Sequence, residues 1–544
     1  MTQNISFFGI SKRIAEDFLQ TVIIIDDGAD YPDKTSPKPH VGLQPPQESP
    51  LKSPPSDDQS SSHMEQSKED EEDISHRLDA KAVMDSFARK GILCSVFLVD
   101  EADRESLSET AYSLASCSDI VVLDWSLQKD DGEKALEIIQ NFLKQTLSEP
   151  TQLRLIAVYS GTPDIHKISD KIKEVLNTFK SAEFFESDDG FTLEIGYTKI
   201  VVFAKKGTMV IKDHESRIVS FEELADKLTD EFAMMTSGLV SNVVLKSLAQ
   251  VRKNTPKILK NFSKGLDAPY LTHRALLSTP DDAKEHLVHL VAEELQAILE
   301  EAQIGETVNM DVIEAWIKSK NQTDFQLDDT LTFSQDELLS LLKNGFKESN
   351  KISKNQAKKA HKKPITKMFL GEEKETQFLD ERFSLFTIMR SYYKQHRPRL
   401  TLGTILKVES ETPEFWLCIQ PRCDCVVRDK SSRAFPFLPL LIKGDNSKFD
   451  TVLFDENKYI RTQSVTNPFE IKLIHFKPSA NEEIITAKEE NDSYYFKDTE
   501  NNKYKWMGEL RFEHAQRISN EFAANISRVG LDESEWLRLW KTKG

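Results

Sequence analysis

Short apolar runs alternate with amphipathic stretches in the N-terminal part of the chain. The runs lie at 21–25, 92–99, 119–124, 153–160 and 198–204, and the stretches between them, near 76–90, 103–116, 132–147 and 164–180, have helical spacing. Apolar runs of this length are typical of buried parallel strands. Their alternation with helices predicts an α/β fold with a doubly wound sheet of five parallel strands. The functional site of such a sheet lies at the carboxyl ends of its strands.

Helical patterns follow the fifth strand. Ser220 with Glu223 predicts a capping box at the start of one helix, and Pro256 predicts a break between later ones. A further helix places a set of apolar residues on one face, namely Leu287, Leu290, Val291, Leu295 and Ile298. We therefore expect residues 236–345 to form a helical domain.

A basic stretch separates this region from the C-terminal part. Nine lysines and a single glutamate lie between Lys343 and Lys367, with few apolar residues, so we expect a flexible linker over 346–375. Beyond it, apolar runs predict strands at 401–408, 415–420, 435–442, 449–454 and 469–476. A helix with one apolar stripe follows at 512–526. Residues 376–544 are expected to form a C-terminal α+β domain of unknown role.

One stretch lacks the composition of a folded segment. Eight prolines, many serines and an acidic run lie between Asp30 and Glu72, with few large apolar residues to offset the entropy of ordering the chain. We therefore expect a disordered insertion at 28–75, inside a first domain that extends over 1–235.

The overall composition limits the classes of function. The chain has 544 residues, too many for one hydrophobic core, and no apolar window long enough for a membrane span. A net charge of −18 disfavours non-specific binding to nucleic acid or to anionic membranes. Five cysteines, an odd and sparse set, favour a reducing compartment, and no secretory signal is present. A cytoplasmic location is expected.

Polar side chains follow the predicted strands in a defined order. Asp26 and Asp27 follow the first strand, Asp124 and Ser160 end the third and fourth, and the pair Lys205–Lys206 follows the fifth. Singly, such residues are common as helix caps or surface groups. Together, they occupy the edge of the sheet where a functional site is expected.

The loop after the third strand carries a recognisable motif. The segment VVLDWSLQKDDG resembles the phosphoacceptor loop of two-component receiver domains, and Asp124, Leu127, Asp131 and Gly132 match its pattern. Gln128 replaces a residue that is usually proline. About twenty extra residues before the lysines, including 182–197, depart from the family spacing and could add a hairpin. The resemblance implies a flavodoxin-like receiver fold.

The resemblance also implies a role for each polar residue. Asp124 would be the nucleophile that accepts a phosphoryl group, and it would bind Mg²⁺ together with Asp26, Asp27 and the backbone carbonyl of Ser126. A divalent cation removes the repulsion between a carboxylate and a phosphoryl group, and it prefers oxygen ligands. Ser160 would donate a hydrogen bond to the acyl phosphate, and a lysine would pair with its charge.

The register of that lysine stays open in the sequence. Lys205 directly follows the apolar strand, which favours it. Lys206, in contrast, would place Phe203 three positions earlier, where receivers often have a switch aromatic.

Fainter similarities extend over the whole chain. EFWLCIQPRCDCV, FLPLLI and AQRISNEFAANISRVGLDESEWLR are similar to segments of large bacterial response receiver domain proteins, which are encoded near sensor histidine kinases, some of them in phage defence. The expected function is therefore a phosphorelay. Its partners would be a sensor histidine kinase or phosphotransfer protein and a downstream effector. Such a protein is a phosphoacceptor with autocatalytic chemistry and not a conventional turnover enzyme.

Two other classes of function are weighed against the phosphorelay. The first is a scaffold or adaptor whose receiver-like domain is never phosphorylated. The second is nucleic-acid binding through the lysines of 343–367, which the absence of interleaved aromatic residues disfavours.

Candidate metal ligands outside the receiver motif are weak. The cysteines Cys418, Cys423 and Cys425 have a C-x4-C-x-C spacing without a second pair, and His286, His289 and Glu293 fit a solvated helix edge better than a metal site.

Overall fold

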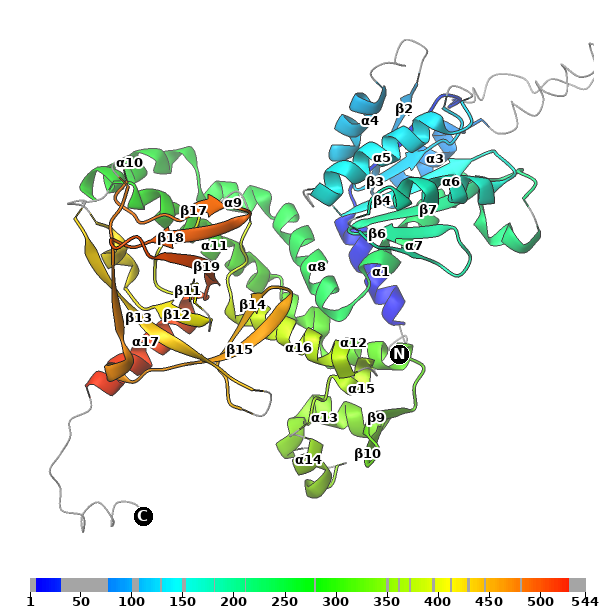
Figure 1. Ribbon diagram of the computed structural model, residues 1–544. Coiled ribbons are helices and arrows are strands. Elements are labelled where there is room, and N and C mark those ends of the chain that lie inside the picture. The colour runs from blue at the N-terminus through cyan, green and yellow to red at the C-terminus, as the bar shows by residue number, and fades with distance from the viewer. Residues whose placement is uncertain are drawn as a thin grey trace, which may run out of the picture. The chain divides into compact units, whose positions relative to one another are not determined.

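Contacts divide the chain, in a computed structural model, into two compact units, Met1–Gln322 and Thr323–Gly544 (Figure 1). The structure describes residues 6–30, 77–99, 107–127, 130–148, 153–180, 182–210, 212–277, 280–348, 352–360, 363–370, 373–393, 397–410, 413–427, 431–444, 447–479 and 482–527. From residue 31 onward, the insertion predicted at 28–75 lies outside the described residues. The expected domain boundaries at 235, 345 and 375 stay predictions.

The first unit contains the five predicted parallel strands. They are β1 (Thr21–Asp26), β2 (Leu93–Leu98), β3 (Ile120–Leu123), β4 (Arg154–Ser160) and β7 (Thr198–Lys205). The strands lie in the order β2-β1-β3-β4-β7, and every neighbouring pair is parallel. The apolar runs therefore form a doubly wound sheet, as predicted, with β1 next to its centre.

The sheet is larger than the predicted five strands. The extra residues before the lysines form an antiparallel hairpin, β5 (Phe184–Glu186) and β6 (Thr192–Ile195), and β6 pairs with β7. The two-residue strand β8 (Ile218–Val219) pairs with the end of β7 in parallel. The sheet thus has eight strands, and β7 has neighbours along both of its sides.

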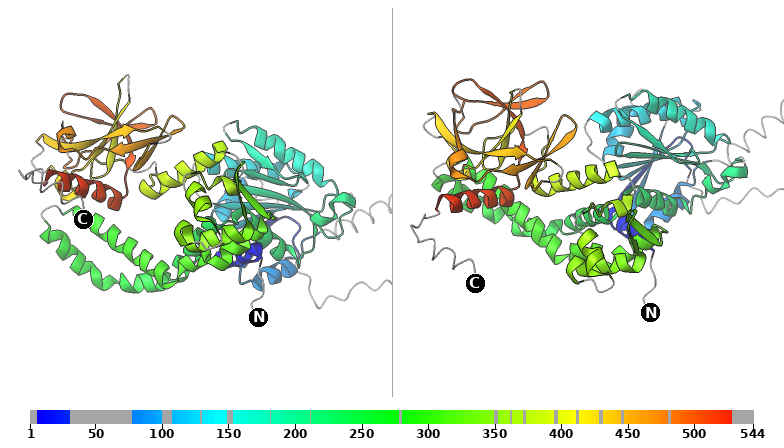
Figure 2. Two further views of the ribbon diagram at one scale, coloured as in Figure 1. Left: turned by 90° about the horizontal axis from the view of Figure 1, so that it is seen from below. Right: turned by 60° about the horizontal axis from the view of Figure 1, so that its bottom comes forward.

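Helices cover both faces of this sheet (Figure 2). The core on one face holds buried residues of α4 (Leu107–Ser116), α5 (Glu133–Ser148) and α6 (Ile165–Asn177). The core on the other face holds residues of α1 (Phe7–Phe18), α3 (Ala80–Ala88) and α7 (Leu224–Thr236). Successive residues of a strand point to opposite faces, so a strand with two covered faces is largely apolar.

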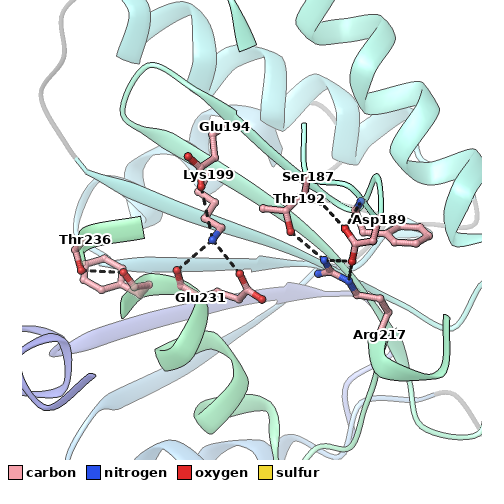
Figure 3. Close-up of polar contacts among 10 residues, drawn as sticks. Ser187, Asp189, Thr192, Glu194, Lys199, Arg217, Glu231 and Thr236 are labelled. Atoms are coloured by element: carbon pink, nitrogen blue, oxygen red, sulfur yellow. Dashed lines mark hydrogen bonds and ion pairs between the residues drawn. The ribbon is translucent and has the colours of Figure 1, made fainter. Parts of the chain in front are cut away.

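Two ion pairs connect elements around the fifth parallel strand (Figure 3). The Lys199 ammonium of β7 lies 3.0 Å from the Glu231 carboxylate of α7, and each residue is only 4% exposed. The Arg217 guanidinium binds Asp189 and Thr192 of the hairpin. Because an unpaired buried charge is costly, the Lys199–Glu231 pair holds α7 on β7, and Arg217 joins the hairpin to the turn at 212–217.

The helical part of the first unit follows α7. Its helices are α8 (Leu239–Lys253), α9 (Thr255–Asn261), α10 (Asp267–Leu276), α11 (Asp282–Glu301) and α12 (Met310–Ser319). The break predicted at Pro256 is confirmed, because α8 ends at Lys253 and Pro256 lies in the first turn of α9. Of the predicted apolar face of α11, Ile298 is buried, whereas Leu287 is 38% exposed.

The predicted capping box is formed only in part. The Glu223 carboxylate accepts hydrogen bonds from the backbone N–H and the hydroxyl of Ser220, but α7 begins at Leu224 and not directly after Ser220. None of the described helices is long and apolar enough to span a membrane by itself. The pair α7 and α8, bent by 120°, passes the same test of length and composition jointly, and α7 packs its apolar face against the sheet.

The second unit starts with an unpredicted hairpin, β9 (Asp324–Asp328) and β10 (Leu331–Ser334). Four helices follow: α13 (Gln335–Glu348), α14 (Lys354–Ala360), α15 (Lys367–Leu370) and α16 (Glu373–Ile388). The segment 346–375, expected to be a flexible linker, therefore contains helical turns. Ala360 and Met368 are buried there, whereas Lys358, Lys359 and Lys363 are exposed, so a few apolar side chains anchor this stretch.

A nine-stranded antiparallel sheet forms the rest of this unit, in the order β14-β15-β13-β12-β11-β19-β18-β17, with β16 paired to β13. The five predicted strands are present as β11 (Thr404–Val408), β12 (Glu414–Cys418), β13 (Arg433–Ile442), β14 (Thr451–Asp455) and β16 (Lys472–Phe476). Four polar strands were not predicted: β15 (Lys458–Ser464), β17 (Lys488–Glu490), β18 (Ser493–Lys497) and β19 (Lys503–Glu509). The predicted helix is α17 (Phe512–Ile526), which buries Ala515, Ile518 and Phe522.

Candidate functional site

Four of the predicted polar residues lie at the carboxyl ends of neighbouring parallel strands. Asp26 ends β1, Asp124 directly follows β3, Ser160 ends β4 and Lys205 ends β7. All four are buried, although their side chains are polar. Parallel strands bring these positions to one edge of the sheet, so residues far apart in the sequence meet there.

Lys205 joins two of the acids. Its Nζ lies 2.7 Å from Oδ1 of Asp124 and 3.1 Å from Oδ2 of Asp26. We call these three residues the Asp26–Asp124–Lys205 cluster. Lys206 is exposed, and its charge acts on Glu223. The lysine that reaches the acids is therefore Lys205, whereas Phe203 packs in the core as a fully buried ring.

Backbone N–H groups orient the remaining oxygens. Oδ1 of Asp26 accepts a hydrogen bond from the Gly28 N–H at 2.8 Å, and Oδ2 of Asp124 accepts one from the Ser126 N–H at 2.9 Å. Each bond spans two residues and so closes a local turn just after the strand. Each carboxylate therefore turns one oxygen toward its own loop and the other toward Lys205.

The other predicted residues lie beside the cluster. Oγ of Ser160 accepts a hydrogen bond from the Thr162 N–H at 3.0 Å, so this hydroxyl is part of the turn after β4. Asp27 is half-buried and follows Asp26 directly. Ser126 is also half-buried, two residues after Asp124.

The charges of the cluster do not balance. Burial raises the pKa of Asp124, the Lys205 ammonium lowers it and the Asp26 charge raises it, and the net result lies above the ordinary value. Burial by itself would lower the pKa of Lys205, but the charges and hydrogen bonds of Asp124 and Asp26 outweigh it and raise the pKa. One ammonium thus faces two carboxylates, which leaves negative charge in a buried place.

This excess of carboxylate charge fits a hard divalent cation. Mg²⁺ binds proteins through one or two carboxylates and keeps several of its waters. Among the described residues, no three His, Cys, Asp or Glu side chains converge closely enough to form a complete metal site. A cation held by carboxylates of this edge would complete its coordination with water.

The loop that contains the motif is shaped by a positive backbone angle. Asp131 and Gly132 have φ values of 52° and 91°, and the indole of Trp125, only 1% exposed, lies directly against Gly132. A Cβ at position 132 would lie 2.1 Å from this ring. The motif therefore needs glycine at position 132 both for its backbone angle and for the space that Trp125 occupies.

Gly132→Ala is expected to destabilise the first unit by about 2–5 kcal/mol, because left-handed strain adds to overpacking of a buried ring. The matched control is Gly207→Ala. Gly207 also has a positive φ, of 98°, but nothing lies within 4 Å of an added Cβ, so a cost of only ~1–2 kcal/mol is expected. Denaturant unfolding measures both variants. Equal losses would show that the contact with Trp125 contributes nothing.

The fold and this site define an α/β protein with a buried acidic cluster at the carboxyl edge of a parallel sheet. Residues 18–210 match the family model of the response receiver domain, so this part of the chain is a response receiver domain. Neither the curated proteins nor the solved structures contain a match to the chain. The family match ends at residue 210, and the similarity of the remaining chain to large response receiver proteins stays a prediction.

The weaker metal candidates gain no support. Cys418 and Cys425 are buried, Cys423 is exposed, and all three are free thiols. No metal-binding group of three or more side chains occurs within the described segments, around these cysteines or around His286, His289 and Glu293. Trp125 is a residue of the site that the motif did not indicate. The only available signal was its place between Asp124 and the Asp131–Gly132 pair.

Proposed function

We propose that this protein is a phosphorelay component whose receiver domain accepts a phosphoryl group on Asp124 in a Mg²⁺-dependent reaction. The observation that carries the proposal is the buried lysine bridge: the Lys205 ammonium contacts both Asp124 and Asp26 at the carboxyl edge of the sheet. The match of residues 18–210 to the response receiver domain supports the same function.

In the proposed reaction, a carboxylate oxygen of Asp124 attacks the phosphorus of a phosphohistidine. The new O–P bond forms as the N–P bond breaks, and the imidazole of the donor leaves with the electron pair. Lys205, already in contact with Asp124, then pairs with the added negative charge, and the Ser160 hydroxyl donates a hydrogen bond to a phosphoryl oxygen. Asp26, the second partner of the Lys205 ammonium, helps to orient it.

Asp26, Asp27, Asp124 and the Ser126 carbonyl would hold the Mg²⁺, which neutralises charge between the carboxylate and the phosphoryl group. We infer that the donor is a sensor histidine kinase or a phosphotransfer protein, and that the helical and C-terminal parts transmit the state to an effector. Free thiols at all five cysteines support a cytoplasmic location. A setting in phage defence remains an implication of the resemblance alone.

The test is phosphorylation of the full chain by a small phosphodonor such as acetyl phosphate. Intact-mass measurement is expected to show one phosphoryl adduct in the presence of Mg²⁺ and none after chelation by EDTA. Alkaline hydroxylamine should remove the adduct, because an acyl phosphate is cleaved by this nucleophile. A chain that neither takes up a phosphoryl group from the donor nor binds the beryllofluoride mimic would instead be the unphosphorylated scaffold.

A further inference from the structure

A buried hydrogen bond connects the centre of the sheet to the segment that leads into α7. The hydroxyl of Tyr159 on β4 donates to the carbonyl oxygen of Val219 on β8 at 2.8 Å, across 60 residues of sequence. The ring is 1% exposed and belongs to the core that also contains the apolar face of α7. A tyrosine hydroxyl in such a place needs a partner, and this carbonyl supplies it.

The same ring lies beside the acidic cluster. Nζ of Lys205 lies 5.9 Å from the centre of the Tyr159 ring, close to the limit of a cation–π contact. Lys205 and Val219 are also register partners in the pairing of β7 with β8. Lys205, Tyr159 and Val219 therefore form a triangle with a contact along each side, and Lys205 is the member that touches Asp124.

Val219 is followed by the helices that leave the receiver sheet. Ser220 and Glu223 form the turn after it, and α7 begins at Leu224. Helix α1 packs against both α7 and α8. Phe18 stacks on Phe232 of α7 with ring centres 5.9 Å apart, and the Asn242 amide of α8 donates to the Ser11 hydroxyl at 3.0 Å. A shift at the start of α7 can therefore reach α8 through the contacts of both helices with α1.

We propose that Tyr159 is a positioning residue that couples the charge of the Asp26–Asp124–Lys205 cluster to the start of α7 and, through α1, to α8. The inference rests on the proposed function. A phosphoryl group on Asp124 adds negative charge, which draws the Lys205 ammonium away from Asp26 and changes its distance to the Tyr159 ring. The hydroxyl of that ring holds Val219, so the change reaches the backbone that leads into α7.

The test compares Tyr159→Phe with the wild type in the full chain. Phenylalanine keeps the ring and the core volume but removes the hydroxyl. Beryllofluoride with Mg²⁺ serves as the probe, and hydrogen exchange of the amides of 219–253 is measured with and without it. We expect both proteins to bind the probe, and the probe-induced change in exchange to fall about tenfold in Tyr159→Phe.

Tyr112→Phe is the matched control. Tyr112 is on α4, on the opposite face of the sheet, where its ring lies 6.0 Å from that of Phe142. This variant is expected to keep the full response of 219–253. A purely structural role of Tyr159 would change exchange equally with and without the probe and leave the difference unchanged. An undiminished difference in Tyr159→Phe therefore overturns the proposal.

A second measurement separates this inference from the proposed function. If the wild type binds neither phosphoryl group nor beryllofluoride, the proposed function fails. The coupling is then read from a double-mutant cycle of Lys205→Met and Tyr159→Phe, with exchange of 219–253 as the readout. Non-additive effects support the role of Tyr159, and additive effects overturn it.

Discussion

Asp124→Asn is expected to abolish the phosphoryl adduct, whereas Asp131→Asn, in the same loop, is expected to keep it. The amide of asparagine is not a nucleophile toward phosphorus, and its oxygen lacks the negative charge with which a carboxylate binds Mg²⁺. Asp131 is 63% exposed in its side chain and pairs with Lys167 and Lys171 on α6. Intact-mass measurement with acetyl phosphate and Mg²⁺ decides between the two aspartates.

The loss of the adduct in Asp124→Asn is not expected to result from unfolding. Lys205 keeps Asp26 as its partner at 3.1 Å, so the substitution leaves no unpaired buried ammonium. The pKa of Asp124 lies above its ordinary value of 3.8 in the folded chain, so its ionisation opposes folding as the pH rises through that raised pKa. Relative to the wild type, Asp124→Asn should therefore gain stability as the pH rises above 3.8.

Thermal unfolding over this pH range checks the sign of the effect. An adduct of equal yield on Asp124→Asn would remove Asp124 from its proposed role as the nucleophile. A variant that unfolds at room temperature would show that the carboxylate has a structural role that its raised pKa does not predict.

Lys205→Met is expected to destabilise the metal-free protein by about 3–5 kcal/mol, because it leaves two buried carboxylates without their cation. The matched control is Lys206→Met, which removes an exposed ammonium from the adjacent position and should change the free energy of unfolding by only ~0.5 kcal/mol. Denaturant unfolding in the presence of EDTA measures both. If Lys206→Met were the more destabilising change, Lys206 and not Lys205 would be the lysine that pairs with the acids.

Mg²⁺ and low pH should each reduce the loss of stability caused by Lys205→Met. A divalent cation restores the missing positive charge, and its affinity should exceed that for the wild type, in which the ammonium competes for the same oxygens. Protonation of the two carboxylates at low pH removes the repulsion between their negative charges. The difference in the free energy of unfolding between wild type and variant should therefore shrink as the pH falls. A loss independent of both Mg²⁺ and pH would mean that packing of the lysine stem, and not its charge, stabilises the cluster.

The acidic residues of the site could be predicted because their position depends on sequence order alone. Apolar runs alternate with helices, parallel strands end at one edge, and Asp26 and Asp124 each follow such a run. The pair Asp131–Gly132 belongs to the same motif. The need for glycine at position 132 became clear only from the structure, in which the indole of Trp125 lies against it. Local patterns thus identified the acidic residues and the glycine, and packing explained why position 132 is glycine.

The lysine could not be assigned from the sequence, because Lys205 and Lys206 are adjacent and both follow an apolar strand. The alternation of side chains along β7 decides between them: Lys205 shares its face with Phe203 and reaches Asp124, whereas the next residue turns to solvent. Such a choice depends on where the strand ends, which is a property of its pairing with β4 and β8.

The sequence by itself determined the alternating α/β order, the acidic residues at the strand ends and the presence of a second, strand-containing part, because each follows from local hydrophobic period and chain order. Only the tertiary structure decided the eight-stranded size of the sheet, the helical turns in the lysine-rich segment and the link from Tyr159 to Val219. Short polar strands and lysine-rich helices bury few apolar residues, so their stability comes from neighbours that lie far away in the sequence.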